Sequence, residues 1–114
     1  MGRDTVNEIC QALPGAERSD PWGGGHDAWK VGGKMFACIG VANDGVSVKT
    51  PSVEDAALLI EMARAVKAPY FHRSWVRVDW EAVAEEELRD RIETSYRIVF
   101  GGLTKKKQRD IAGG

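Results

Sequence analysis

Apolar residues recur along the chain at two different spacings, which together predict a mixture of helices and strands. Three stretches have the three-to-four-residue spacing of an amphipathic helix: residues 4–13, 53–65 and 82–100. Ser52, with Asp55 three residues later, is the expected N-cap residue of the second helix. The third helix has the clearest apolar stripe, which is formed by Leu88, Ile92, Tyr96, Val99 and Phe100.

Shorter runs between these helices have the alternation that is typical of β-strands. They predict strands over residues 17–22, 26–31, 34–41, 46–49 and 74–80. The first of them is short, and we expect it at an edge of the sheet. Without that edge strand, the predicted elements follow the order α-β-β-β-α-β-α.

The two central strands are joined by Gly32-Gly33, a pair that favours a tight hairpin turn because glycine tolerates positive φ. A two-residue turn predicts two opposed pairs: Trp29 with Phe36 and Val31 with Lys34. One face of the sheet would then hold Trp29, Val31, Phe36 and Cys38. The other face would hold Lys30, Met35, Ala37, Ile39 and Val41. Since the second strand is apolar on both faces, we expect cover on both sides or a face that receives a partner.

The length of 114 residues and the hydrophobic fraction of 43% suit one domain, which we place over residues 1–103. Sixteen basic and seventeen acidic residues give a net charge of −1, which lacks the basic excess of a strong nucleic-acid binder. No apolar run approaches about 18 residues, and no signal-peptide pattern opens the chain. We therefore expect a cytoplasmic protein that does not enter membranes.

The last residues, 104–114, form a basic segment that contains Lys105, Lys106, Lys107 and Arg109. A polar end of this kind predicts a flexible, solvated tail. The same lysines could instead contact phosphates without sequence preference.

No pattern of catalytic or metal-binding residues emerges from the chain. His26 and His72 are far apart in sequence, whereas a metal site needs several converging ligands. Cys10 and Cys38 lack the spacing of a redox or zinc motif and are expected to be buried. The serines have no nucleophile motif around them. The sequence therefore predicts no enzyme, no cofactor and no metal.

Basic residues on the predicted strands and their loops form the most suggestive set: Lys30, Lys34, Lys49, Arg73 and Arg77. Trp75 and Tyr70 lie close to them in sequence. Cations neutralise phosphates and aromatic rings stack on exposed bases, so such a surface could bind nucleic acid. The alternative is a set of separate solvated charges balanced by Asp27, Asp44 and Asp79.

Several short runs of residues, which follow one another along the chain in the same order as in the family, resemble the MmcQ/YjbR family of small bacterial proteins. The most specific is His-Asp-Ala-Trp-Lys-Val-Gly-Gly-Lys-Met-Phe-Ala over residues 26–37. The others are Leu-Pro-Gly-Ala at 13–16, Val48-Lys49, Pro69-Tyr70, Trp-Val-Arg-Val at 75–78 and Ser-Tyr-Arg-Ile-Val at 95–99. The chain departs from the commoner family pattern over residues 71–75, where one basic residue, Arg73, precedes Trp75 in place of a more basic run.

The resemblance implies an α+β fold, a two-layer sandwich in which an antiparallel sheet packs on helices. This fold is similar to that of type III secretion chaperones and is compared with frataxin. The resemblance also implies DNA binding through the basic residues of the sheet and its loops. On this chain they correspond to Lys30, Lys34, Lys49, Arg73 and Arg77, to which we add Trp75 and, in the tail, Lys105, Lys106 and Lys107. The alternative is a dimeric, chaperone-like module that binds protein and has no nucleic-acid activity.

Overall fold

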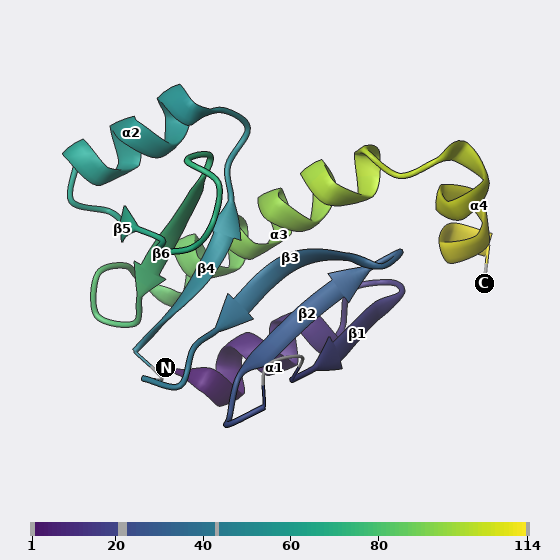
Figure 1. Cartoon of the computed structure of the whole chain (residues 1–114), viewed down its shortest axis with the longest axis horizontal. Helices are drawn as coiled ribbons and strands as arrows, with labels where there is room; N and C mark the ends of the chain where they lie inside the picture. Colours follow the sequence, from purple (N-terminus) through teal and green to yellow (C-terminus); the bar gives the residue numbers. More distant parts are fainter. Residues whose placement is uncertain (1, 21–22, 43, 114) are drawn as a thin grey trace.

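The computed structural model describes residues 2–20, 23–42 and 44–113 and has an α+β architecture with two layers (Figure 1). One layer is an antiparallel six-stranded sheet in the order β1-β2-β3-β4-β6-β5. Its strands are β1 (Ala16–Ser19), β2 (Asp27–Val31), β3 (Lys34–Ile39), β4 (Gly45–Lys49), β5 (Val66–Lys67) and β6 (Trp75–Asp79). The helices are α1 (Arg3–Gln11), α2 (Val53–Glu61), α3 (Glu85–Gly101) and α4 (Lys105–Gly113).

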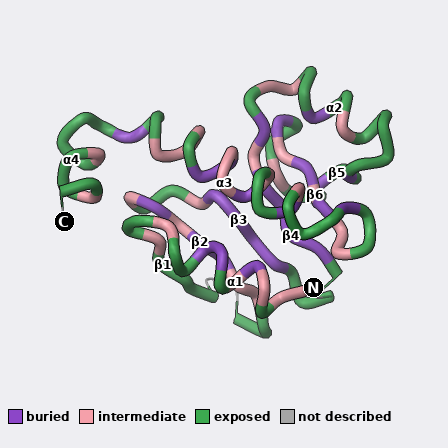
Figure 2. Tube along the Cα trace, turned by 180° about the vertical axis from the view of Figure 1, so that it is seen from behind, coloured by how far each residue is buried: buried purple, intermediate pink, exposed green. Residues whose placement is uncertain are grey.

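Helices α1 and α3 lie together on one side of the sheet, behind it in Figure 1 and in front of it in Figure 2. Helix α2 packs instead beside β5 and β6. As predicted, the side chain of Ser52 caps α2 by accepting a hydrogen bond of 3.0 Å from the backbone N–H of Asp55. The predicted α+β fold with an antiparallel sheet on helices is therefore confirmed.

Two elements were not predicted from the sequence, namely β5 and α4. Strand β5 has only two residues, which is too short for alternation to show. Strand β1 ends at Ser19, and the predicted continuation over residues 21–22 lies outside the described residues.

A bulge in the central hairpin changes the predicted face of several residues. Val31 lies opposite Lys34 as expected, but Trp29 lies opposite Ala37 and not opposite Phe36, because the register shifts between Trp29 and Lys30. Phe36 is thus an extra residue in β3. Trp29 consequently shares its face with Ala37 and Ile39, whereas Cys38 lies on the other face beside Ala28. The predicted grouping of Cys38 with Trp29 is wrong.

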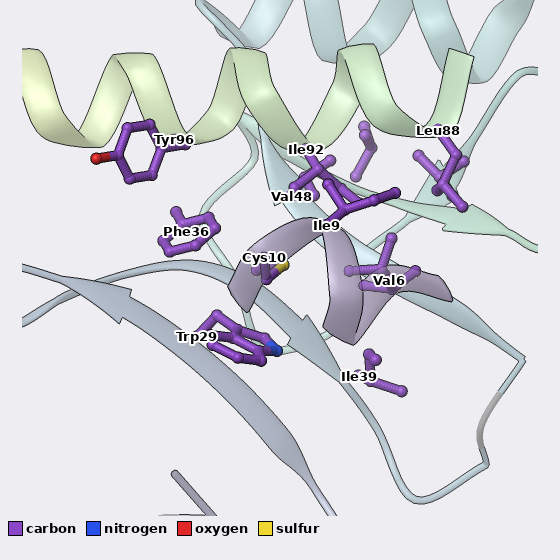
Figure 3. Close-up of a cluster of buried hydrophobic side chains, with 14 of the residues drawn as sticks. Val6, Ile9, Cys10, Trp29, Phe36, Ile39, Val48, Leu88, Ile92 and Tyr96 are labelled. Atoms are coloured by element: carbon purple, nitrogen blue, oxygen red, sulfur yellow. The ribbon is translucent and has the colours of Figure 1, made fainter. Parts of the chain in front are cut away.

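The core lies between the sheet and the α1–α3 layer (Figure 3). Trp29 is completely enclosed and donates from its ring Nε1 to Asn7 Oδ1 of α1 at 2.8 Å. Phe36 contacts Tyr96 of α3 edge to face, with 5.3 Å between ring centroids. The other large buried side chains from the two layers include Val6, Ile9, Ile39, Val48, Leu88 and Ile92.

Ser95 of α3 separates the ends of β3 and β4. The β3–β4 ladder pairs Ala37 with Val48, so the next opposed residues would be Phe36 and Lys49. The buried hydroxyl of Ser95 lies between them, donating to the carbonyl oxygen of Phe36 at 2.6 Å and accepting from the N–H of Lys49 at 2.8 Å. Figure 1 shows the two strands diverging beyond this point while α3 passes behind them. The sheet is therefore split at one end.

Residues 105–113 form α4, where the charge pattern predicted a flexible tail. Leu103, two residues before α4, is buried, and its side chain lies so close to Gly32 that a Cβ added to this glycine would be 2.6 Å from the leucine. Ile111 similarly approaches Gly15, with 2.9 Å to a hypothetical Cβ. The C-terminal segment thus packs beside the central hairpin turn. Within the described residues, no helix is both long and apolar enough to span a membrane.

Candidate functional site

The sheet face opposite α1 and α3, which we call the open face, has a row of small side chains. Ala28, Cys38, Ser47 and Arg77 are neighbours in the register across β2, β3, β4 and β6. Because Cys38 and Ser47 are small, the sheet surface is hollowed beside Arg77. The resulting open-face hollow has a volume of about 510 Å³, which is within the range of small-ligand sites. Its lining includes Cys38, Asp44, Ser47, Tyr70, Phe71 and Arg77.

Two polar side chains with groups unpaired among the described residues face this hollow. Ser47 is only 8% exposed as a residue, and its hydroxyl forms no hydrogen bond within the described residues. Arg77 donates from Nε to Asp79 Oδ1 at 2.7 Å, and this hydrogen bond raises the pKa of Arg77. The terminal amino groups of Arg77 have no partner among the described residues. These groups remain available to a ligand, whereas the thiol of Cys38 stays protonated because burial raises its pKa to about 11.

An aromatic loop forms one rim of the hollow. The Tyr70 side chain is fully exposed, and its φ of 73° lies in the left-handed region that favours glycine. Phe71 stacks on Trp75 with 4.6 Å between ring centroids and 19° between planes. Ser74 anchors the end of the loop, because its carbonyl oxygen accepts a 2.7 Å hydrogen bond from the Thr50 hydroxyl. The loop therefore holds two aromatic rings at the hollow's edge.

A second concavity lies where β3 and β4 diverge, and we call it the split groove. Its volume is about 470 Å³, and its lining includes Ile98 and Val99 of α3 and Gly102 directly after the helix. The other lining residues are Lys34, Met35, Lys49, Phe71 and Trp75. Neither lysine forms an ion pair with any residue that the structure describes. Since Phe71 lines both concavities, the split groove and the open-face hollow are adjacent.

The structure brings together only part of the predicted basic set. Lys34, Lys49 and Trp75 meet in the split groove, and Arg77 lies in the neighbouring hollow. Lys30 lies in β2 opposite Met35, outside both linings, and Arg73 is exposed in the loop before β6. Lys105, Lys106 and Lys107 are exposed on α4, where Lys107 Nζ donates to the carbonyl oxygen of Gly32 at 3.4 Å. The nine predicted residues therefore do not all line one concavity.

Sequence reasoning missed Ser47, Asp44 and Phe71 as parts of a site. A usable signal was present for Ser47, because the alternation over residues 46–49 puts Ser47 on the same strand face as Lys49. No local pattern indicates that Phe71 stacks on Trp75. Among the described residues, no group of three or more histidines, cysteines and acidic residues is placed to hold a metal ion.

Comparisons with known proteins support the resemblance to the family. The family model named YjbR matches residues 11–98. The uncharacterized protein YbdF of Escherichia coli O157:H7 is 28% identical over 115 aligned residues, which cover 97% of this chain and 94% of YbdF. The crystal structure of Deinococcus radiodurans protein DR2400, which carries a DUF419 domain, superposes with a TM-score of 0.83 at 21% identity. That superposition covers 96% of this chain and 86% of DR2400, and it supports the fold.

Proposed function

The chain belongs to the YjbR family, and we propose that it is a DNA-binding protein that holds its ligand in the split groove and the open-face hollow. The observation that supports this most is the position of Lys34 and Lys49, which form no ion pair with the described residues and lie beside a stacked aromatic pair. Lysines neutralise phosphates, and an aromatic surface accepts bases by stacking. The proposal assigns binding and no reaction to these residues. The expected location is the cytoplasm.

The net charge of −1 limits where DNA can bind. A strong field over the whole surface is not available, so the attraction must be local and sensitive to salt. The split groove meets this requirement because its lining contains two lysines and no acidic residue. The open-face hollow is different, because Arg77 there lies near Asp44 and Asp79. We therefore assign phosphate contacts to Lys34 and Lys49.

Fluorescence anisotropy with a labelled oligonucleotide at about 50 mM salt tests this assignment. The double variant Lys34→Gln/Lys49→Gln is expected to bind about tenfold more weakly, and its salt dependence should be shallower by roughly one to two units of the log–log slope. Lys67→Gln on β5 is the matched control, since Lys67 lies outside both concavities and should bind like the parent. DNA binding is rejected if neither duplex nor single-stranded DNA raises the anisotropy at low salt.

A second candidate function, a dimeric protein-binding module, is favoured by a different surface. Helix α2 and the residue after it expose three large apolar side chains: Leu58 at 52%, Ile60 at 40% and Met62 at 57%. Leu58 and Met62 are one helical turn apart and share a face, and adjoining exposed apolar residues are typical of protein-interaction sites. Sedimentation velocity at about 50 µM distinguishes the candidates: this function predicts a dimer that Leu58→Gln/Met62→Gln converts to monomers. A parent chain that sediments as a monomer would exclude the homodimer.

A further inference from the structure

We infer that the open-face hollow receives one unpaired nucleobase, so that the nucleic acid held by this chain is single-stranded and is bound most tightly at guanine. This inference rests on the proposed nucleic-acid binding and adds to it the form of the strand and the base that is recognised. The phosphates are assigned to the split groove and the base to the hollow beside it.

The polar groups of the hollow comprise both hydrogen-bond donors and acceptors. The terminal amino groups of Arg77 are donors without partners among the described residues, and the Asp44 carboxylate at the same lining is an acceptor. The hydroxyl of Ser47 can do either. Guanine presents O6 and N7 as acceptors and carries N–H donors on its pairing edge, so it matches Arg77 and Asp44 together.

The charges around Arg77 argue against a simple anion in the hollow. Asp79 already accepts from Arg77 Nε at 2.7 Å, and Asp44 also acts on the guanidinium electrostatically. A carboxylate or phosphate placed here would meet two negative groups for one positive group. A neutral base avoids this repulsion and still uses the free donors of Arg77. The unpaired hydroxyl of Ser47 gives it a further partner.

The aromatic rim of the hollow and its distance from the split groove favour a single-stranded nucleic acid. Tyr70 is fully exposed and Phe71 lies at the edge, so both rings are placed to pack against an inserted base. Bases inside a duplex are stacked and paired, and only a splayed base can enter a pocket. Ser47 and Lys49 are two residues apart on the same face of β4, which corresponds to about 7 Å. This distance is within the span of one nucleotide.

Anisotropy measurements with four labelled probes test the inference: a ten-nucleotide thymine strand, the same strand with one central guanine, its RNA counterpart, and the duplex form. We expect the guanine strand to bind about tenfold more tightly than the thymine strand, and the duplex to bind no better than thymine alone. The RNA arm distinguishes a DNA ligand from an RNA ligand of the same base chemistry.

Variants of the hollow must lower the ratio of guanine-strand to thymine-strand affinity, and this ratio is the readout because Arg77 belongs to the proposed binding surface. Arg77→Met removes the donors at similar length, and Asp44→Asn is a second variant at an exposed position that leaves the fold intact. Arg89→Met on the exposed side of α3 is the control and should retain the tenfold preference. Equal affinity for the thymine and guanine strands would overturn the base pocket while leaving DNA binding in place. Absence of binding to every probe would overturn both proposals.

Discussion

The two faces of the sheet are built from the same strands and differ in almost every other respect. The face toward α1 and α3 holds large apolar side chains such as Trp29, Ile39 and Val48, which are fully buried against the helices. The open face holds Ala28, Cys38, Ser47 and Arg77, and the hollow beside the last three is lined by no residue of the helices that the structure describes. The comparison indicates that alternate residues of one strand point to the core and to the candidate site. Neighbouring residues should therefore respond very differently to substitution.

The largest expected contrast is between two neighbours on β3. Ile39→Ala removes a completely buried side chain from the core, and we expect it to lower the free energy of unfolding by about 3 kcal/mol. Cys38→Ala removes one sulfur atom at the edge of an existing hollow and should cost less than about 1 kcal/mol. Urea denaturation followed by tryptophan fluorescence measures both. Equal losses would show that the open face is packed as tightly as the helix face.

The next effect concerns Ser95, whose hydroxyl lies between the ends of β3 and β4. Ser95→Ala would leave the N–H of Lys49 and the carbonyl of Phe36 without their shared partner, at a cost of about 2 kcal/mol. Thr94→Ala, its half-buried neighbour on α3, is the control and should change stability by less than about 0.5 kcal/mol. Hydrogen exchange at the Lys49 amide should accelerate only in the first variant. An unchanged amide would mean that β3 and β4 close the gap themselves.

A smaller, pH-dependent effect belongs to the helix face. Burial of Asp27 raises its pKa, but hydrogen bonds from Asn7 and Arg3, the latter at 2.6 Å, outweigh burial and hold the pKa below its usual range. The resulting stabilisation is present above the ordinary carboxyl pKa near 4 and is lost as the pH falls through the lower folded value. Urea midpoints at pH 7 and pH 3 measure it. Asp27→Asn should reduce the difference between the urea midpoints at the two pH values, whereas Asp90→Asn, at an exposed position of α3, should preserve this difference.

The two thiols provide the mildest comparison, because their reactions need not alter the fold. Burial raises the pKa of Cys10 to about 12 and that of Cys38 to about 11, so both are protonated at pH 8. Cys38 nevertheless borders the hollow, and we expect it to react slowly with a disulfide reagent in the native protein. Cys10 is a fully buried residue of α1 and should react only on unfolding. Reaction of Cys10 before Cys38 would contradict the assignment of the faces.

The order of elements was predictable because α1, α3 and most strands have clear periodicity, whereas the register of β3 was not. Five consecutive residues from Met35 to Ile39 are all apolar, so alternation cannot reveal that Phe36 is an extra residue. The helical pattern of α4 was also hidden, since its one sizeable apolar side chain, Ile111, packs against the distant Gly15. Such contacts depend on tertiary structure and leave no local pattern.

The candidate site was predictable in its charges and not in its shape. Lys34, Lys49 and Trp75 were all expected to contribute, and their strand positions do bring them together. The depth of the hollow depends on small residues from separate strands, and the split groove depends on Ser95. A hollow made by small residues can be predicted only after their neighbours across the sheet are known.

The packing of the C-terminal segment against the central turn affects when the chain can complete its folding during synthesis. Lys107 contacts the carbonyl of Gly32 across 75 residues of sequence, and Leu103 fills the space beside the same glycine. This contact cannot form on the ribosome until residues 103–107 have emerged. The hairpin that has the most distinctive sequence in the protein consequently gains its full set of native neighbours long after its own synthesis, and a nascent chain that stops before Leu103 leaves its turn uncovered.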